Sequence, residues 1–508
     1  MKHTGEVFPR DEYNLRLKGN VHPDDYENPD PGDASYNLVV IGAGSGGLVS
    51  ALGAAGLGAR VALVEQHLLG GDCLNVGCVP SKALIRSARE ARRVESAVEY
   101  GIHVRGELKV DFAEVMERVR KVRADISAND AVERCRDKGV DVYLGRGRFV
   151  SRDAVEVAGR RLCFSKAVIA TGARPFVPPV DGLADCAYLT NENVFDLTSL
   201  PERLAVIGGG PIGCELSQAF AQLGSRVTVL SKAAQFLPKE DAFAAKILEG
   251  IFRREGVELC LGVDVRSVRQ CGAKTAIEFE GQDGGAREIE SDAVLVATGR
   301  TPNVEDMGLD AAGVEYDVRH GVEVDSRLRT TNPKIYAVGD VCMQYKFTHA
   351  ADAAARMVIG NALFMGRGKV EDLIIPWCTY TEPEIAHVGL SESRAADEGI
   401  EIDTYKIDLS DVDRALTDGE EAGFAKIHTA KGKGRIMGAT IVAQNAGDMI
   451  SEVTLAMQSG AGLGDLSKTI HPYPTQAEVL RKAADAYNRT RLTPLVAKCM
   501  KKWLEWTR

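Results

Sequence analysis

YNLVVIGAGSGGLVSALGAAGLGARVALVEQ, residues Tyr36–Gln66, is the stretch that decides the fold of this chain. A short run of β-branched residues leads into glycines, a helical stretch follows, and a second apolar strand comes after it. The spacing Gly42-x-Gly44-x-x-Gly47 permits a tight turn, a close approach of the backbone to a pyrophosphate, and close packing of helix on strand. Glu65 closes the second strand, where a carboxylate accepts hydrogen bonds from ribose hydroxyls. The stretch predicts a dinucleotide-binding fold, and a glycine-rich loop without a ligand is the alternative.

The same unit recurs in RLAVIGGGPIGCELSQAFAQLGSRVTVLSK, residues Arg203–Lys232. In both copies 23 positions separate the first glycine from the end of the second strand. The equivalent glycines are Gly208, Gly210 and Gly213. Where the first copy has a carboxylate, this one has Ser231 followed by Lys232, which favours the 2′-phosphate of NADPH over NADH. The alternative is that Lys232 points into solvent and either nucleotide is used.

The amino-acid composition disfavours several classes of protein. The chain has 508 residues and a net charge of −10, which disfavours nucleic acid or an anionic membrane as the main partner. We expect no transmembrane helix, because no apolar run approaches about 18 residues, and no secretory signal, because the N-terminus lacks an apolar core segment. Eleven cysteines, an odd number, are then expected to be mostly reduced, in a cytoplasmic setting.

The segment GGDCLNVGCVPSKAL, residues Gly70–Leu84, holds two cysteines whose purpose needs explaining. Their C-x4-C spacing, with no second Cys/His pair nearby, is unlike a zinc site, so we expect no bound metal. Closing so short a loop also removes little entropy from the unfolded chain. A redox pair is favoured, because Pro80 suits a first helical turn and places Cys78 near a helix N-terminus that stabilises a thiolate. Lys82 follows Cys78 by four residues and could share its helical face.

Together these motifs resemble the class I pyridine nucleotide–disulfide oxidoreductases, the family of dihydrolipoamide dehydrogenase, glutathione reductase and mercuric reductase. The resemblance extends from Tyr36 to about Leu492. It rests on both glycine loops, GGDCLNVGCVPSK, the two ATG segments, YAVGD and a C-terminal PT-x-x-E. It implies an α/β chain of two Rossmann-like dinucleotide-binding domains plus a C-terminal α+β dimerisation domain.

The domain boundaries expected from this resemblance follow the motifs. They are an N-terminal extension at 1–35, the FAD-binding domain at 36–185 and again at 303–370, the NAD(P)-binding domain at 186–302, and the dimerisation domain with its tail at 371–508. The resemblance implies FAD in the first fold and a nicotinamide nucleotide in the second. It also implies a homodimer in which the partner subunit completes the active site.

The resemblance implies a role for each matching residue. Cys78 becomes the charge-transfer thiol nearest the flavin and Cys73 the interchange thiol, while Lys82 pairs with Glu215 beside the flavin. Asp340 binds the FAD ribitol, and a helix starting near Thr348 points its N-terminus at the flavin. The ATG segments add the expected cofactor contacts Thr171, Gly172, Gly299 and Arg300.

The stretch IHPYPTQAEVL departs from the disulfide-reducing members, in which a His directly precedes PT and serves as the thiol base. Here Tyr473 holds that position, Glu478 lies five residues on, and His471 comes two positions early. A phenol with a reference pKa of about 10 is a poor base for a thiol. Either His471 reaches the site by a local rearrangement, or the enzyme does not need this base. A Tyr at this position resembles mercuric reductase, although the N-terminal C-x-x-C module and a C-terminal Cys-Cys pair are missing.

We therefore expect an FAD enzyme that passes electrons from NADPH or NADH to the Cys73–Cys78 disulfide and on to a metal ion such as Hg(II) or Cu(II), a quinone or a small disulfide. One alternative is dihydrolipoamide dehydrogenase, which reduces NAD+. Another, of a different class, is a flavoprotein subunit or scaffold without turnover.

The tail carries Trp503 and Trp506 among basic residues. We expect it to pack on the dimer, a membrane surface being the alternative, and we expect no stable membrane insertion.

Overall fold

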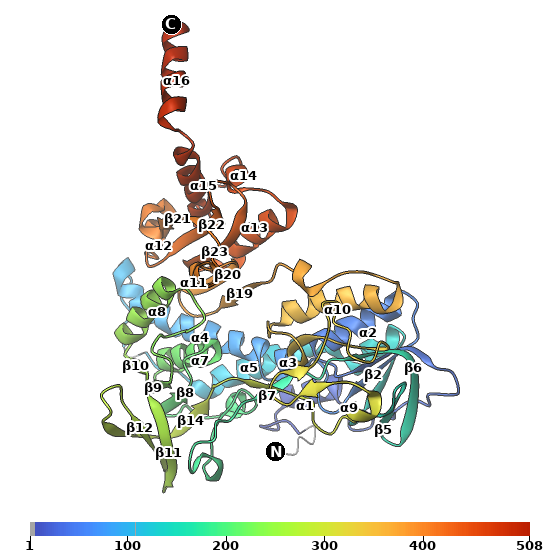
Figure 1. Ribbon diagram of the computed structural model, residues 1–508. Helices are drawn as coiled ribbons and strands as arrows, with labels where there is room; N and C mark the ends of the chain where they lie inside the picture. Colours follow the sequence, from blue (N-terminus) through green and yellow to red (C-terminus); the bar gives the residue numbers. More distant parts are fainter. Residues whose placement is uncertain (1–5, 107) are drawn as a thin grey trace. The chain divides into compact units, whose positions relative to one another are not determined.

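The computed structural model describes residues 6–106 and 108–508, and the element counts below refer to these residues. By their contacts they form two compact units. One unit runs up to Ala234 and continues in Glu255–Leu373, and the other joins Gln235–Arg254 to Ile374–Arg508. Figure 1 shows the elements of both, coloured along the chain.

The main sheet of the first unit has seven strands in the order β3-β2-β1-β6-β5-β4, with β18 also pairing β6. Its strands are β1 (Tyr36–Ile41), β2 (Val61–Glu65), β3 (Val140–Leu144), β4 (Arg148–Ser151), β5 (Ala154–Val157), β6 (Arg160–Ile169) and β18 (Ile335–Ala337). The strands β3, β2, β1, β6 and β18 are parallel, with Leu38 opposite Val61 and Lys166, whereas β4, β5 and β6 pair antiparallel. The parallel part forms the predicted dinucleotide-binding fold.

Helices α2 (Ser45–Gly56) and α10 (Thr348–Leu363) lie beside each other against this sheet (Figure 1). Glycines of α2 permit the close approach: a Cβ at Gly46 would lie 2.9 Å from a methyl of Val338, and one at Gly53 would lie 2.6 Å from Ile359. The start of α10 is thereby held close to the glycine-rich loop that precedes α2.

A second parallel sheet, in the order β10-β9-β8-β14, belongs to the same unit. Its elements are β8 (Arg203–Ile207), α7 (Pro211–Gln222), β9 (Arg226–Ser231), β10 (Glu258–Leu261) and β14 (Ala293–Val296). An antiparallel sheet of β11 (Asp264–Cys271), β12 (Lys274–Glu280) and β13 (Ala286–Ser291) follows it. The predicted α/β class with two Rossmann-like folds is confirmed.

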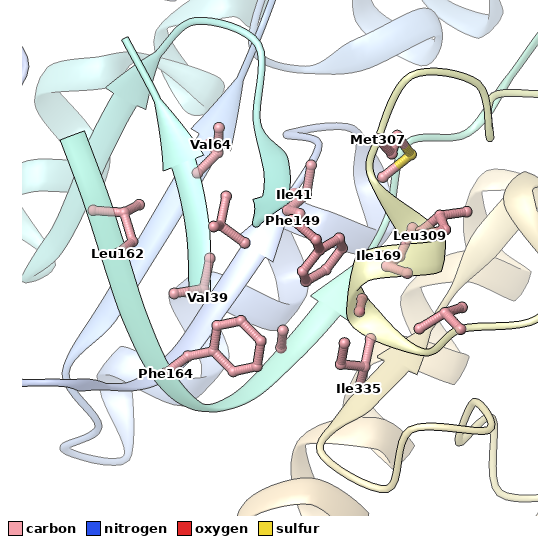
Figure 2. Close-up of a cluster of buried hydrophobic side chains, with 14 of the residues drawn as sticks. Val39, Ile41, Val64, Phe149, Leu162, Phe164, Ile169, Met307, Leu309 and Ile335 are labelled. Atoms are coloured by element: carbon pink, nitrogen blue, oxygen red, sulfur yellow. The ribbon is translucent and has the colours of Figure 1, made fainter. Parts of the chain in front are cut away.

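The two sheets with parallel strands in this unit have separate apolar cores. Figure 2 shows Val39, Ile41 and Val64 from the parallel strands meeting Phe149 and residues near Met307. The second sheet buries Ile207, Leu230 and Val294 in a separate cluster. These two cores and a third in the second unit agree with the length of the chain, since single cores rarely grow beyond about 250–300 residues.

The second unit contains the antiparallel sheet β19-β20-β23-β22-β21 and helices around it, so the expected C-terminal α+β domain is present. The strands are β19 (Pro376–Thr379), β20 (Glu384–Gly389), β21 (Ile402–Asp408), β22 (Phe424–Ala430) and β23 (Ile436–Ala443). The helices are α8 (Ala242–Arg254), α11 (Glu392–Asp397), α12 (Asp413–Asp418), α13 (Ala446–Ser459), α14 (Leu463–Leu466), α15 (Glu478–Thr490) and α16 (Pro494–Trp506).

The segment Gln235–Arg254 groups with this second unit, although the expected NAD(P)-binding domain 186–302 contains it. Three contacts explain the grouping. Lys426 Nζ lies 2.7 Å from Asp241 Oδ2, Trp377 Nε1 donates to Glu240 Oε1 at 2.9 Å, and the Phe243 and Phe424 rings are 5.3 Å apart. The order of motifs along the sequence does not predict contacts between residues so far apart in the chain.

The expected N-terminal extension contains a helix, α1 (Glu12–Val21), which packs on α5 (Phe112–Ser127) through buried Leu17 and Val21. Beyond α1, the side-chain amide of Asn28 both donates to Leu144 O and accepts from Leu144 N. This exchange satisfies backbone groups at the edge of the main sheet, as a neighbouring strand would.

The remaining elements are short or link these layers. They are α3 (Gly71–Asn75), α4 (Cys78–Ser96), α6 (Val132–Asp137), α9 (Leu309–Ala312), β7 (Ala173–Pro175), β15 (Arg300–Pro302), β16 (Tyr316–Asp317), β17 (Gly321–Val322) and the 3-10 turns η1 (Ala97–Tyr100), η2 (Ala128–Asp130), η3 (Leu183–Asp185), η4 (Val194–Asp196), η5 (Gly339–Val341), η6 (Val370–Asp372) and η7 (Leu409–Asp411). None of the described helices has the length and apolarity needed to cross a bilayer. Within residues 6–106 and 108–508, no group of three or more His, Cys, Asp or Glu side chains is arranged to hold a metal ion.

Candidate active site

The first glycine loop has the geometry that a pyrophosphate requires. Gly42 has φ +101°, and a Cβ there would lie 2.3 Å from Ala170 O. A Cβ at Gly47 would lie 1.8 Å from Gly42 O, so only glycine allows α2 to approach β1 this closely. Gly44 precedes α2 and, as a glycine, provides no side chain to cap this helix N-terminus. The loop therefore fits the phosphates of a dinucleotide, whose charge the helix end stabilises.

Glu65, which we expect to bind a ribose, also accepts hydrogen bonds from the backbone of the first unit. Its Oε2 accepts from Ala43 N at 2.6 Å and its Oε1 from His67 N at 2.8 Å. Burial raises the pKa of Glu65, and these backbone hydrogen bonds oppose the rise. Each carboxylate oxygen can accept a second hydrogen bond, so Glu65 can fix both the loop and a ribose.

The second glycine loop repeats this geometry. Gly208 has φ +122°, and a Cβ at Gly213 would lie 2.1 Å from Gly208 O. At Gly210, the residue before α7, a Cβ would meet no described heavy atom within 4 Å. Beyond the loop, Ser231 is buried, while the Lys232 side chain is 88% exposed with Nζ 3.7 Å from Asp264 Oδ1. The loop has room for phosphates, and Lys232 has an acidic neighbour.

Cys73 lies in α3 and Cys78 is the first residue of α4, as Pro80 predicted; both are free thiols, and Cys78 is exposed. Thr348, the first residue of α10, places its Oγ1 3.5 Å from Cys78 Sγ. The hydrogen bond from Cys73 lowers the pKa of Cys78 to about 6, helped by Thr348 and the charge of Lys82. The same hydrogen bond and burial raise the pKa of Cys73. The pair therefore holds its negative charge on Cys78 and its proton on Cys73.

Lys82 and Glu215 form the expected ion pair. Lys82 lies one helical turn beyond Cys78 on α4, and its Nζ is 2.7 Å from Glu215 Oε2 on α7. The Glu215 side chain is 9% exposed and that of Lys82 is 35% exposed. The pair joins the helix that starts at the thiols to the helix that starts at the second glycine loop.

Arg300 connects the expected cofactor residues of three loops. Its guanidinium contacts Asp72, next to Cys73, and its Nε lies 3.3 Å from Asp340 Oδ2 on η5. Burial raises the pKa of Asp340, and Arg300 opposes this rise. Gly299, the residue before Arg300, accepts from Phe176 N at 2.9 Å.

The first ATG segment is held to the second by backbone and side-chain hydrogen bonds. Thr171 Oγ1 donates to Asn303 O at 2.8 Å, and Asn303 N donates to Gly172 O at 3.0 Å. Directly after the two segments, the chain forms the short strands β7 and β15, which pair antiparallel. The loops that follow β6 and β14 are thus brought together on the same unit as the two glycine loops.

The candidate proton-handling residues lie on the second unit and do not form a His–Glu478 pair. His471 Nε2 lies 3.0 Å from Glu452 Oε1 on α13, and its Nδ1 lies 3.1 Å from Thr469 O. Tyr473 is 71% exposed and donates to Asp413 Oδ2 at 2.9 Å, a hydrogen bond that raises the pKa of Tyr473. Buried Glu478 accepts from Arg481 instead.

Sequence reasoning missed a buried link between the N-terminal helix and the thiol segment. Arg123 on α5 donates through Nη1 to Asn75 O at 2.7 Å and through Nη2 to Asn14 Oδ1 at 2.5 Å. Asn75 ends α3, and Asn14 is on α1. An arginine in the middle of a helix gives no sequence signal for such a contact.

Comparisons with known proteins match two regions of the chain. A model described as pyridine nucleotide–disulphide oxidoreductase matches residues 36–355, and one for the dimerisation domain of these proteins matches residues 375–484. The chain is 35% identical over 460 residues to mercuric reductase from Bacillus cereus, covering 91% of this chain and 73% of that protein. It is 34% identical over 463 residues to dihydrolipoyl dehydrogenase from Chlamydia muridarum, covering 89% and 96%.

Two solved structures resemble the chain over most of its length. LpdA from Mycobacterium tuberculosis superposes with a TM-score of 0.81 at 28% identity, covering 89% of this chain and 99% of that one. The Cu(II) complex of the HOCl-induced flavoprotein disulfide reductase RclA from Escherichia coli superposes with a TM-score of 0.78, also at 28% identity, covering 88% and 98%.

Proposed function

The chain belongs to the pyridine nucleotide–disulphide oxidoreductase family, and from this premise we propose that Cys73 and Cys78 pass electrons from NADPH to a thiophilic metal ion such as Hg(II) or Cu(II). The family membership establishes an FAD-dependent oxidoreductase that uses NAD(P)H and acts on metal or disulfide acceptors. Its dimerisation domain fits a homodimer. The identity of the acceptor, the preferred nucleotide and the roles of individual residues are proposals.

The residues that would hold FAD are Gly42, Gly44 and Gly47 at the phosphates, Glu65 at the ribose, and Asp340 at the ribitol. When bound there, FAD supplies two-electron transfer between nicotinamide and disulfide. The exposed side of Cys78 and the start of α10 form the neighbouring surface. The ion pair with Glu215 fixes the position of the Lys82 ammonium near Cys78.

The reduced pair is organised for a single negative charge. Thr348 and the N-terminus of α4 stabilise the Cys78 thiolate, while Cys73 keeps its proton and donates a hydrogen bond to that thiolate. When the dithiol re-forms the disulfide it releases two electrons, enough for one Hg(II) to become Hg(0) or two Cu(II) to become Cu(I). The proton of Cys73 is released to solvent. Its departure requires either a base that accepts it or a metal ion that takes its place on the sulfur.

The observation that carries the choice of a metal acceptor is the placement of His471 and Tyr473. A disulfide acceptor needs a base for the interchange thiol, but Tyr473 stands directly before Pro474, and its hydrogen bond to Asp413 raises the pKa of the phenol. His471, two positions earlier, pairs with Glu452 and not with Glu478, which accepts from Arg481. A thiophilic cation instead displaces the thiol proton by binding sulfur directly. Dihydrolipoamide dehydrogenase chemistry remains the second candidate, because relatives with that name match the chain as well as mercuric reductases do.

The test is rapid mixing of the NADPH-reduced enzyme with Hg(II), Cu(II), lipoamide, oxidised glutathione and quinones, followed by flavin absorbance. We expect reoxidation by metal ions at least ten times faster than by lipoamide. Tyr473→Phe removes the phenol that stands in the place of the base and should slow the metal reaction at least tenfold, while His471→Ala should leave it within about twofold. The reverse pattern, with fast lipoamide turnover abolished by His471→Ala, would establish the dehydrogenase instead.

We also propose NADPH as the preferred nucleotide. In support, Ser231 and Lys232 stand where a carboxylate would repel a 2′-phosphate, and Arg266 lies 3.0 Å from the same Asp264 that neighbours Lys232. A phosphate beside Ser231 would therefore meet Lys232, while Arg266 is paired with both Asp264 and Glu280 and draws Asp264 away from the lysine. Lys232→Ala should raise the KM for NADPH about tenfold and leave the KM for NADH unchanged. Lys274→Ala, which removes an exposed lysine from β12, is the matched control.

A further inference from the structure

The C-terminal helix α16, Pro494–Trp506, is exposed over its whole length. Thr493 caps its N-terminus by accepting from Val496 N at 3.3 Å. A helix of 13 residues is only marginally stable alone in water, and Trp503 and Trp506 are 62% and 77% exposed. A helix that is capped but exposes two tryptophans indicates a surface that binds a partner.

The apolar residues of α16 occupy one broad face. At 100° per residue they fall on a half-turn of the helix, and the polar residues fall on the other half. The apolar face comprises Leu495, Val496, Cys499, Met500, Trp503, Leu504 and Trp506. Its two indole rings lie 5.3 Å apart. A face about 180° wide exceeds the narrow seam of a two-helix coiled coil.

The opposite face is basic. It carries Lys498, Lys501 and Lys502, with Glu505 as its acidic member, and Arg508 follows two residues after the helix ends. From Arg489 to the end, six basic side chains face one acidic side chain, although the chain as a whole has a net charge of −10. Positive charge is thus concentrated where the exposed tryptophans are. Since charges act over about 8 Å at physiological salt, the tail can bind an anionic surface that the rest of the chain does not attract.

We propose that α16 binds the headgroup region of an anionic lipid bilayer, lying in its plane with Trp503 and Trp506 inserted and the lysines at the phosphates. A wide apolar face with tryptophans opposite a lysine-rich face is the pattern of interfacial helices. A second copy of the chain is the other candidate occupant. The match to the dimerisation domain ends at residue 484, ten residues before α16 begins, so this helix is not part of the recognised dimer module.

The test uses the full-length enzyme loaded with FAD and vesicles of phosphatidylcholine alone or mixed with phosphatidylglycerol. We expect flotation with the mixed vesicles only, together with a blue shift of tryptophan fluorescence. Raising the salt concentration to about 1 M should lower the amount of enzyme that floats with the mixed vesicles at least tenfold. Trp503→Ala/Trp506→Ala and Lys501→Glu/Lys502→Glu should each weaken binding at least tenfold.

Controls distinguish the lipid surface from the alternatives. Lys138→Glu/Arg319→Glu reverses two exposed charges outside α16 and should leave flotation unchanged. All three variants should retain flavin and NADPH oxidation, because α16 holds no residue of the candidate active site. Absence of flotation with mixed vesicles, or equal flotation of the tryptophan variant, would overturn the proposal. A fall in molecular mass of the tryptophan variant without any loss of flotation would assign the helix to a second copy of the chain.

Discussion

At the scale of single residues, Thr348 is the side chain whose effect on Cys78 is easiest to measure. Its hydroxyl lies 3.5 Å from Cys78 Sγ and helps to lower the pKa of that thiol to about 6. Thr348→Ala removes this hydrogen bond and should raise the pKa of Cys78 by about one unit. In the reduced enzyme, the thiolate–flavin absorbance band should then appear at higher pH than in the wild type.

Thr348→Ser keeps the hydroxyl and is the matched control. Its band should titrate close to that of the wild type, since only a methyl group is lost. Equal titration of the alanine and serine variants would show that the N-termini of α4 and α10 alone stabilise the thiolate.

At the scale of elements, α1 supports the thiol segment through α5. Asn14 is fully buried, and its Oδ1 accepts from Arg123, whose other amino group holds Asn75 O. Asn14→Ala removes the hydrogen bond to a buried cation and should lower the free energy of unfolding by about 2–3 kcal/mol. Denaturant unfolding of the FAD-loaded enzyme measures this loss, and FAD release should accelerate in parallel because the loop at Asn75 loosens.

Asn20→Ala is the control on the same helix. Asn20 donates to Ser127 Oγ at 2.8 Å and has no recorded contact with the thiol segment among the described residues. Its loss should cost about 1 kcal/mol and leave FAD release unchanged. Equal effects of the two variants would mean that α1 stabilises the fold in general and does not act on the thiol segment.

The same elements show why some features could be predicted and others could not. The sequence predicts the glycine loops because the positive φ of Gly42 and the close backbone contact at Gly47 permit no other residue. The start of α4 was readable from Pro80. The contact of Thr348 with Cys78 joins positions 270 residues apart and depends on how α10 packs on α2. Only the tertiary structure contains such information.

At the scale of the whole molecule, the chain crosses between its two units more often than its motifs suggest. The segment Gln235–Arg254 leaves the first unit and joins the C-terminal sheet, with Lys426 as its main polar anchor. Lys426 Nζ contacts Asp241 at 2.7 Å and Glu392 at 2.8 Å, and the side chains of Lys426 and Asp241 are 8% and 6% exposed. A buried charge pair between segments 185 residues apart therefore helps to define the second unit.

Removing the lysine tests this anchor. Lys426→Met leaves the Asp241 carboxylate buried without its cation and should lower the free energy of unfolding by about 3–5 kcal/mol. Hydrogen exchange should accelerate first in α8, which follows Asp241. Lys431→Met breaks the exposed pair with Asp403 and should cost under about 1 kcal/mol. Lys426→Met/Asp241→Leu, which removes both charges, should recover part of the loss; if it is no more stable than the single variant, packing and not charge determines the effect.

The pH dependence gives a second measurement of the same anchor. Burial opposes ionisation of Asp241, but the hydrogen bond from Lys426 and those from two backbone N–H groups lower its pKa overall. In the wild type, the ionised carboxylate therefore stabilises the fold above its unfolded pKa, and this contribution is lost as the pH falls through the lower folded value. In Lys426→Met, burial acts without the lysine and raises the folded pKa, so stability is lost as the pH rises. The difference between the two proteins should accordingly widen from about pH 4 to pH 7 in denaturant titrations, and a difference independent of pH would exclude the carboxylate as its source.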